Sequence, residues 1–265
     1  MSITTVSRVL NGKSKQFRIS KSSQDLVMKA AEEHGYRTNY AQNLRNSPHH
    51  TLGLLIPGID SLFFSKLAGI VIREAQKYKY GVMVIDSAED PREEEKAVET
   101  FRKRGIDGLI VVPTSATDFV FKEIAEEMPV VLIDRYFEDS DLPHVATDNY
   151  VGAFEATNLL IANGHRKILC LQGSPTWITS RKRVEGYRDA MIKAGLEQYI
   201  NIKGNDFTPE NGYIESKLAL LGSDDITAIL ALSSTILLGS LRAIGEQGLS
   251  IPEDISLLSF DTNVF

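Results

Sequence analysis

The chain has 265 residues, a net charge of −6 and 43% hydrophobic residues, so it can bury the core of one large domain or of two small ones. No stretch reaches the roughly 20 apolar residues of a membrane-spanning helix, and no apolar block of a secretion signal follows Met1. This pattern argues against a membrane protein and predicts a cytoplasmic one. The single cysteine, Cys170, excludes an intramolecular disulfide, and its apolar neighbours predict a place in the core.

Charge is distributed unevenly along the chain. Residues 1–50 carry eight lysines and arginines against three acids, a net charge of +5, whereas the remaining 215 residues carry −11. A small basic segment on an acidic body indicates that only the N-terminal segment meets a polyanion. A chance cluster of surface lysines is the alternative that charge alone leaves open.

The first segment, SITTVSRVLNG, predicts a short helix with an N-cap at Ser2 and an end at Asn11 and Gly12. Its apolar residues fall on one face, and its hydroxyls and single arginine fall on the others. Arginine can bond guanine through two hydrogen bonds and hydroxyls bond phosphate oxygens, so these faces suit a DNA groove. An ordinary solvated helix is the alternative interpretation. The apolar residues are Val6, Val9 and Leu10, and the outward ones are Ile3, Thr4, Thr5, Ser7 and Arg8.

A second helix is predicted between a cap at Ser20 and the closing Gly35. The polar segment that follows contains one isolated apolar candidate, Leu44, and is interpreted as a linker that becomes helical on binding. The residues expected to face inward from the second helix are Val27, Ala30 and Ala31.

From residue 52 onward, short apolar runs alternate with segments of helical length. In the first series the runs begin 22 to 30 residues apart, a spacing typical of βαβ units. Their continuous apolar character is typical of parallel strands covered on both faces. A second series follows, so the predicted body is two consecutive doubly wound α/β subdomains with a crossing near residue 150. The predicted strands are 52–56, 82–86, 108–112 and 130–134 in the first subdomain, and 168–172, 228–232 and 256–260 in the second.

One helix between these strands carries clear end signals. Asp90 is placed to cap it, Pro91 occupies its first position, and Gly105 follows its last turn. The charged run REEEK, residues 92–96, predicts a solvated face of this helix.

Charged side chains follow several of the predicted strands. Ligands bind beyond the carboxyl ends of parallel strands, and the space between two subdomains is a natural place for a small molecule. Carboxylates and guanidiniums bond paired hydroxyls in a defined geometry, so these residues suit a polyhydroxylated ligand. Structural ion pairs or helix caps are the alternative for Asp134, Arg135 and Asp148. The residues are Asp134, Arg135, Asp148, Arg181, Arg183 and Asp261.

The N-terminal motifs SITTVSRVLNG, AAEEHGYRTN and AQNLR before TLGLLIP resemble those of the lactose-repressor (LacI/GalR) family of bacterial transcription regulators. The resemblance implies that the first motif is the recognition helix of a helix-turn-helix, with Ile3, Thr4 and Arg8 facing bases in the major groove. It also implies that AQNLR is a hinge helix whose Leu44 wedges into the minor groove. The implied phosphate contacts are Ser2, Thr5, Ser7 and Asn11.

The body resembles the effector-binding domain of the same family in VVLIDR, SRKRVEGYRDAM, GNDFTPENGY and LSIPEDISLLSFD, which occur in family order. The segment SLFFSKLAGI implies that Phe63 and Phe64 line the pocket. Where many relatives have Asn-Asp, this chain has Ser233 and Ser234, and Ser234 joins the predicted effector set. The remaining implied effector contacts are Asp134, Asp148, Arg181 and Asp261, with Thr114 or Ser115 beside them.

The resemblance also predicts that family segments before Ser2 and after Phe265 are missing from this chain. The predicted domains are a partial helix-turn-helix over residues 1–36, a hinge helix and linker over 37–51, and two effector-binding subdomains over 52–148 and 149–265.

The sequence contains no P-loop, His-Glu-x-x-His, cysteine pair or Gly-x-Ser-x-Gly elbow, so an enzyme is not predicted. No cofactor and no metal site are predicted, although the pair His49 and His50 leaves a metal as an alternative. The predicted function is a ligand-responsive transcriptional repressor of carbohydrate-metabolism genes. Its predicted partners are double-stranded operator DNA, a sugar or sugar derivative and a second copy of the chain. The alternative is a truncated sugar-binding sensor of the periplasmic-binding-protein type that does not bind DNA by itself.

Overall fold

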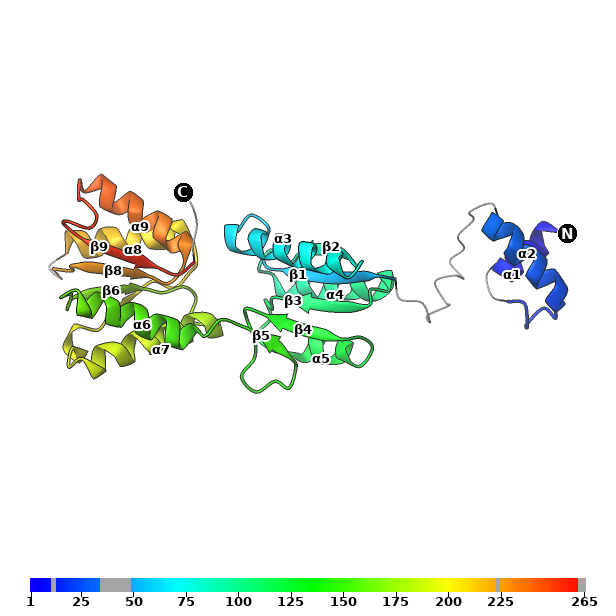
Figure 1. Cartoon of the computed structure of the whole chain (residues 1–265), viewed down its shortest axis with the longest axis horizontal. Helices are drawn as coiled ribbons and strands as arrows, with labels where there is room; N and C mark the ends of the chain where they lie inside the picture. Colours follow the sequence, from blue (N-terminus) through cyan, green and yellow to red (C-terminus); the bar gives the residue numbers. More distant parts are fainter. Residues whose placement is uncertain (11–12, 34–48, 223–224, 262–265) are drawn as a thin grey trace.

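The computed structural model describes residues 1–10, 13–33, 49–222 and 225–261. A pair of helices is followed by two separate parallel β-sheets with helices on both faces (Figure 1). The predicted fold class, a helical head with two consecutive doubly wound α/β units, is confirmed. We name these units the first lobe, residues 49–145, and the second lobe, residues 149–261. In the described ranges, no helix combines the length and the apolarity needed to cross a bilayer.

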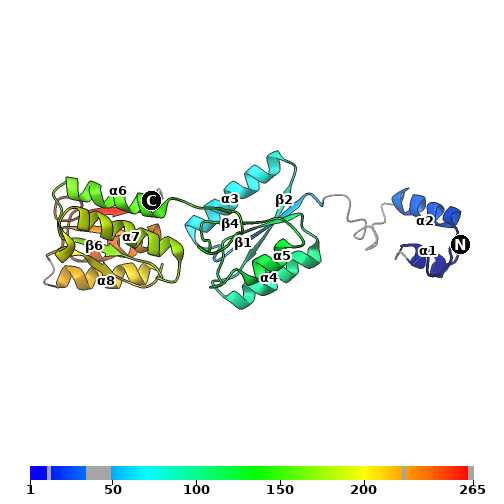
Figure 2. The same cartoon turned by 90° about the horizontal axis from the view of Figure 1, so that it is seen from below.

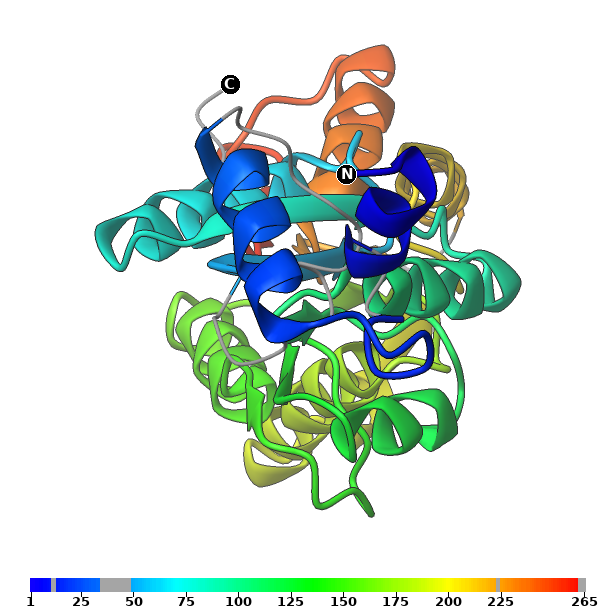
Figure 3. The ribbon, with the colours of Figure 1, turned by 90° about the vertical axis from the view of Figure 1, so that its right-hand side faces the viewer.

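The head consists of α1 (Ile3–Leu10) and α2 (Lys21–Glu33), which lie against each other (Figure 3). Hydroxyl oxygens cap both helices as predicted, because Ser2 Oγ accepts the Thr5 N–H at 3.1 Å and Ser20 Oγ accepts the Ser23 N–H at 3.3 Å. These caps begin each helix at the residue that the sequence indicates.

The core of the head is small. Val9, Leu10 and Val27 are buried in it, and Ala31 packs against them one turn after Val27. The prediction that Ala30 faces inward is wrong, since Ala30 is exposed. The helices meet along a narrow stripe, and Ala30 lies just outside it.

The first lobe contains a five-stranded parallel sheet in the order β2-β1-β3-β4-β5. Its four predicted strands are confirmed, with ends that differ by one residue. A short fifth strand at the edge was not predicted, because a two-residue strand leaves no apolar run. The elements are β1 (Thr51–Ile56), α3 (Leu62–Lys77), β2 (Gly81–Asp86), α4 (Pro91–Arg104), β3 (Gly108–Val111), α5 (Phe119–Ala125), β4 (Val130–Ile133) and β5 (His144–Val145).

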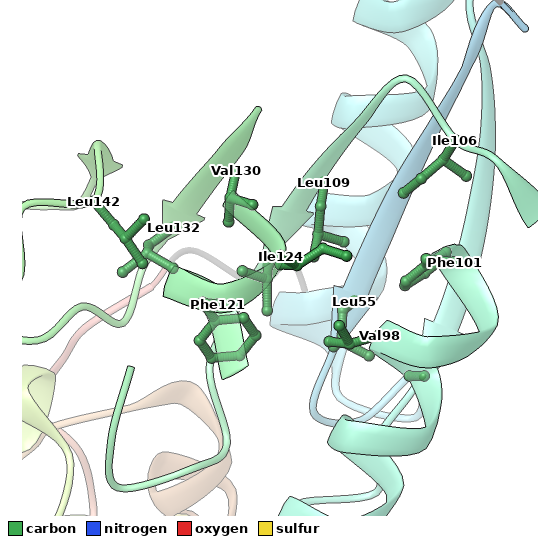
Figure 4. Packing of buried hydrophobic residues seen from close by; sticks show 12 residues of the cluster. Leu55, Val98, Phe101, Ile106, Leu109, Phe121, Ile124, Val130, Leu132 and Leu142 are labelled. Atoms are coloured by element: carbon green, nitrogen blue, oxygen red, sulfur yellow. The ribbon is translucent and has the colours of Figure 1, made fainter. Parts of the chain in front are cut away.

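Helices cover both faces of this sheet, with α3 on one side and α4 and α5 on the other (Figure 2). Strand residues alternate between the two layers, since Leu54 and Ile56 pack under α3 whereas Leu55 packs under α4. The larger cluster contains Phe101 of α4 and Phe121 of α5, which pack on the same face of the sheet (Figure 4). Burial on both faces explains why these strands are continuous apolar runs.

The end signals of α4 are confirmed, but the prediction for its charged run is wrong in part. Asp90 Oδ1 accepts the Arg92 N–H at 2.8 Å, and Gly105 closes the helix with a φ of 68°. Glu94, in the middle of REEEK, is fully buried. Its carboxylate accepts the backbone N–H groups of Thr114 and Ser115 and the Ser115 hydroxyl. One residue of a solvated-looking run therefore holds the loop that follows β3.

The second lobe contains a four-stranded parallel sheet in the order β7-β6-β8-β9. The three predicted strands are confirmed with ends that differ by one residue. The edge strand β7 was not predicted, since only Ile202 of its three residues is apolar. The elements are α6 (Asn149–Ala162), β6 (Ile168–Leu171), α7 (Ile178–Lys193), a 3₁₀ turn (Glu197–Tyr199), β7 (Asn201–Lys203), α8 (Pro209–Leu221), β8 (Ala228–Ala231), α9 (Ser234–Glu246) and β9 (Ser256–Ser259).

Two clusters cover the two faces of the second sheet. Cys170 is fully buried under α6 and α7, which confirms its predicted core position. Tyr187 of α7 is also fully buried, and its hydroxyl donates to Ile168 O at 2.7 Å and accepts the Asn201 N–H at 3.1 Å. Leu169 of β6 and Ile236 of α9 belong to the opposite cluster, under α8 and α9.

Helices α8 and α9 approach each other closely because glycine lies at their contact. A Cβ on Gly239 would lie 1.9 Å from Pro209 O, and one on Gly212 would lie 2.1 Å from Ile236 O. Backbone atoms cannot move aside as a flexible side chain can, so these positions accept no larger residue without separating the helices.

We expect Gly239→Ala to lower the free energy of unfolding by about 1 to 3 kcal/mol, because the added methyl group overpacks the α8–α9 contact. Urea denaturation followed by circular dichroism measures the change. Gly245→Ala is the matched control in the same helix, since a Cβ added there would meet no described atom within 4 Å. The control should be neutral or slightly stabilising, because alanine favours the helix. Equal stabilities for the two variants would contradict the close-packing argument.

Candidate functional site

The outward face of α1 forms one candidate site. Ile3 is 90% exposed, and Thr4 and Ser7 are exposed beside it. The Arg8 guanidinium lies 3.8 Å from the centre of the Phe17 ring. A shallow hollow of about 410 Å³ is lined by Ile3, Thr4, Ser7, Arg8, Lys13 and Phe17.

The other predicted DNA contacts differ in their position. The hydroxyls of Ser2 and Thr5 are hydrogen-bonded to each other at 2.9 Å in the cap of α1. Asn11 and Leu44 lie outside the residues that the structure describes. The DNA-contact roles of the head residues therefore remain predictions, and only the exposed face of α1 is established.

A second candidate site lies at the carboxyl end of β4, where the first lobe meets the second. The side chain of Arg135 is buried and donates to both carboxylate oxygens of Glu89, at 2.7 and 2.9 Å. It also donates to Pro113 O at 3.3 Å. Its guanidinium lies 4.1 Å from the ring centre of Trp177, at the start of α7 in the second lobe, and 5.6 Å from that of Phe64. Arg135 thus connects three loops and both lobes.

Arg183, in the second turn of α7, is the corresponding buried cation of the second lobe. Its Nε donates to Asn149 Oδ1 at 2.7 Å, and another guanidinium nitrogen donates to Leu232 O. The guanidinium lies 4.1 Å from the centre of the Phe260 ring. Burial lowers the pKa of this guanidinium, and the carboxylates of Asp261 and Asp134 raise it.

Two carboxylates complete this charged cluster. Asp134 follows β4 and Asp261 follows β9, and both residues adopt positive φ values, 65° and 68°. Burial raises the pKa of the Asp134 carboxyl above its ordinary value, Arg183 and Arg135 lower it, and Asp261 raises it further. Among the described residues, no hydrogen bond satisfies either carboxylate. We name Asp134, Arg135, Arg183 and Asp261 the interlobe charge cluster.

The aromatic residues predicted to line the pocket lie at the start of α3. Phe64 is buried and meets Phe63 edge to face, with ring centres 5.1 Å apart. Phe64 also lies under the Arg135 guanidinium, so this ring borders the interlobe charge cluster. Phe63 packs against the first-lobe core on the α3 side.

Several predicted effector contacts have structural partners. The Thr114 hydroxyl lies 2.9 Å from Ser87 Oγ inside the first lobe. Asp148 caps α6, where its Oδ1 accepts the Val151 N–H at 3.0 Å. Ser234 is buried in the first turn of α9, which Ser233 caps. These residues occupy caps and loops near the strand ends, and their effector roles remain predictions.

The predicted contact Arg181 lies on the surface. It is exposed, donates to Thr176 O at 2.7 Å and pairs with Glu138 of the first lobe at 3.2 Å. Lys182 pairs with the same carboxylate at 3.4 Å. The helix therefore turns Arg183, rather than Arg181, toward Asp134 and Asp261.

The helical spacing in the sequence indicates that Arg183, and not Arg181, lies on the buried face of α7. Arg183, Gly186, Tyr187 and Ala190 follow the i, i+3, i+4, i+7 spacing of one helix face, and all four are buried. An arginine on the apolar face of a helix must find buried partners, so it stands out from an exposed arginine two residues earlier. Asn149 and Trp177 carried no such signal, because their contacts come from chain segments far apart.

No group of three or more potential metal ligands occurs in the described part of the chain. The guanidiniums and carboxylates of the interlobe charge cluster offer ion pairing and hydrogen bonding to a ligand. Two α/β lobes with two buried arginines and two carboxylates between them, preceded by a basic helical head, are typical of a DNA-binding protein that responds to a ligand.

The comparisons with known proteins give the same class. Residues 1–39 match the model of bacterial regulatory proteins of the lacI family, and residues 49–263 match the model of periplasmic binding proteins and the sugar-binding domain of the LacI family. The chain belongs to the LacI family. It is a ligand-responsive, DNA-binding regulator of transcription and not an enzyme.

Individual relatives support this assignment over most of the chain. Catabolite control protein A of Priestia megaterium is 31% identical over 98% of this chain and 79% of its own length. The ribose operon repressor of Haemophilus influenzae is 28% identical over 98% of this chain and 78% of its own length. The crystal structure of the transcription regulator CcpA of Lactococcus lactis has 27% sequence identity and a TM-score of 0.70, covering 79% of this chain and 77% of that chain.

Proposed function

We propose that this protein represses genes of carbohydrate metabolism, that it binds its operator as a homodimer, and that a sugar or sugar derivative is its effector. The observation that carries the effector proposal is the interlobe charge cluster. Two carboxylates that accept no hydrogen bond from the described residues lie near two buried guanidiniums, and such groups bond paired hydroxyls in a defined geometry. The name of one relative, the ribose operon repressor, supports the same ligand class.

The effector acts on DNA binding through the two lobes. Asp134 and Arg135 belong to the first lobe, and Arg183 and Asp261 belong to the second, so a ligand bonded to both sets would favour one arrangement of the lobes. Its differential affinity for the two arrangements sets the change in operator affinity, a coupling of order 1 to 3 kcal/mol. The proposed division is a head over residues 1–36, a hinge over 37–51, and lobes over 52–148 and 149–265.

The head reads the operator through the exposed face of α1. We propose that Ile3, Thr4 and Arg8 contact bases and that Ser2, Thr5, Ser7 and Asn11 contact phosphates, with Leu44 wedged into the minor groove. Arg8 supplies the strongest expected base contact, because its guanidinium can bond guanine through two hydrogen bonds.

We expect Arg8→Ala to lower the discrimination between the preferred operator and variants with one changed base pair by about 1 to 3 kcal/mol. Fluorescence anisotropy on a duplex selected by the wild-type chain from a randomised DNA pool measures the discrimination. Lys15→Ala is the control, because loss of a loop charge should weaken all duplexes alike and reduce the salt dependence. If Arg8→Ala leaves every discrimination ratio unchanged, Arg8 does not read a base.

A further inference from the structure

Residues 13–20, which precede α2, fold back toward α1. The Lys13 N–H donates to Arg8 O at 2.9 Å, the Phe17 N–H donates to Lys13 O at 3.1 Å, and the Ile19 N–H donates to Ser14 O at 3.0 Å. Ser14 is buried and Ile19 packs against the core of the head. These anchors give the loop a defined position beside α1.

Phe17 is the aromatic residue of this segment, and the residue is 41% exposed. A half-exposed phenylalanine contributes little to the core, which Val9, Leu10 and Val27 form without it. Its ring instead lies under Arg8, with the guanidinium carbon 3.8 Å from the ring centre. In the described part of the chain, no carboxylate pairs with Arg8.

Stacking of the Arg8 guanidinium on the Phe17 ring suits an arginine that contacts a DNA base. A free arginine side chain loses rotamer freedom when it binds, whereas one already held on an aromatic ring loses less. Stacking uses the face of the guanidinium, and the N–H groups that bond guanine lie in its plane. Arg8 and Phe17 line the hollow beside α1 together with the predicted base contacts Ile3 and Thr4. The stacked pair therefore lies on the same exposed face of α1, which we name the reading face.

We propose that Phe17 is a positioning residue for DNA recognition, whose ring holds the Arg8 guanidinium on the reading face and thereby increases the preference for the base pair that Arg8 contacts. The inference rests on the proposed DNA-contact role of Arg8. It assigns a task to the loop between the helices, which otherwise contributes lysines whose contacts with phosphates carry no sequence information.

The test compares variants of the full chain on a duplex selected by the wild-type chain from a randomised DNA pool, and on duplexes with each base pair changed in turn. Phe17→Leu keeps an apolar side chain and removes the ring, so it should reduce discrimination at the Arg8-dependent base pair by about two- to fivefold. Phe17→Tyr keeps the ring and should retain the wild-type discrimination. Leu26→Ala, which changes an exposed apolar residue of α2, is the control and should change nothing.

A double-mutant cycle separates positioning from a general structural role. In an Arg8→Ala background, Phe17→Leu should cause no further loss of discrimination, because the ring acts only through Arg8. Circular dichroism checks that the variants keep the helical content of the wild type. Equal discrimination by Phe17→Leu and the wild type would overturn the role of Phe17 alone, and so would additive losses in the cycle. A wild-type chain that selects no sequence would overturn the proposed operator binding and this inference with it.

Discussion

Arg183→Ala is expected to abolish the response to the effector and to lower the free energy of unfolding by about 3 kcal/mol or more. The variant leaves Asn149 Oδ1 and Leu232 O without their donor and leaves Asp134 near one guanidinium instead of two. Chemical denaturation measures the stability. The effector response is measured as the rise in melting temperature across a panel of pentoses, hexoses and their phosphates, since a ligand that binds only the folded state stabilises it.

Arg181→Ala is the matched control two residues earlier on α7. Arg181 is exposed and pairs with Glu138 at the surface, so its loss should cost less than about 1 kcal/mol and leave the sugar-induced shift largely unchanged. The opposite order of effects, with the response lost in Arg181→Ala and kept in Arg183→Ala, would move the effector site toward the surface of α7.

Asp134→Asn tests the same site without removing a packed cation. Because burial raises the pKa of the Asp134 carboxyl, the ionised form is disfavoured in the folded state, and a neutral amide of the same size should not destabilise the protein at neutral pH. The sugar-induced rise in melting temperature should become much smaller, because the amide keeps one acceptor oxygen and has an NH2 donor in place of the other. A wild-type rise in melting temperature with Asp134→Asn would show that this carboxylate does not contact the effector.

Glu94→Ala is the second variant for which we expect a large effect, a loss of about 3 kcal/mol in the free energy of unfolding. It leaves the N–H groups of Thr114 and Ser115 and the Ser115 hydroxyl without their acceptor and opens a cavity under α4. Glu93→Ala is the control from the same charged run, since Glu93 is exposed and pairs with Lys96 at the surface. A loss of less than about 0.5 kcal/mol is expected for the control, and equal losses would contradict the buried role of Glu94.

The pH dependence of stability provides an independent measurement on Glu94. Burial raises its pKa above the ordinary value of 4.5, while hydrogen bonds from Ser115 and Thr114 and the charge of Arg135 lower it. The folded state therefore binds more protons than the unfolded state between 4.5 and the raised pKa. The contribution of this group is fully present below that window and is lost as the pH rises through it. As the pH rises through this window, the wild type should lose free energy of unfolding relative to Glu94→Gln. Parallel profiles of stability against pH for the two proteins would contradict the raised pKa of Glu94.

The sequence by itself determined the architecture of the body. Seven apolar runs of strand length each became a strand with ends within one residue of the prediction. Strands buried on both faces need continuous apolar residues, and the caps at Ser2, Ser20 and Asp90 depend on oxygens that bond N–H groups two or three residues further along. Such local requirements can be identified in a single sequence. The strands β5 and β7 were not predicted, because they have only two and three residues and contain no apolar run.

The tertiary structure alone decided which charged residues work together. The helical spacing of α7 marks Arg183 as buried, but its proximity to Asp134 and Asp261 follows only from the packing of the two lobes. Glu94 looks like its solvated neighbours, and its buried role follows from the position of the loop after β3. Phe17 reaches Arg8 because residues 13–17 fold back toward α1. Each of these pairings depends on the packing of segments that are distant in sequence or joined by an irregular loop, and the partners of a charged side chain follow from that packing and not from its local pattern.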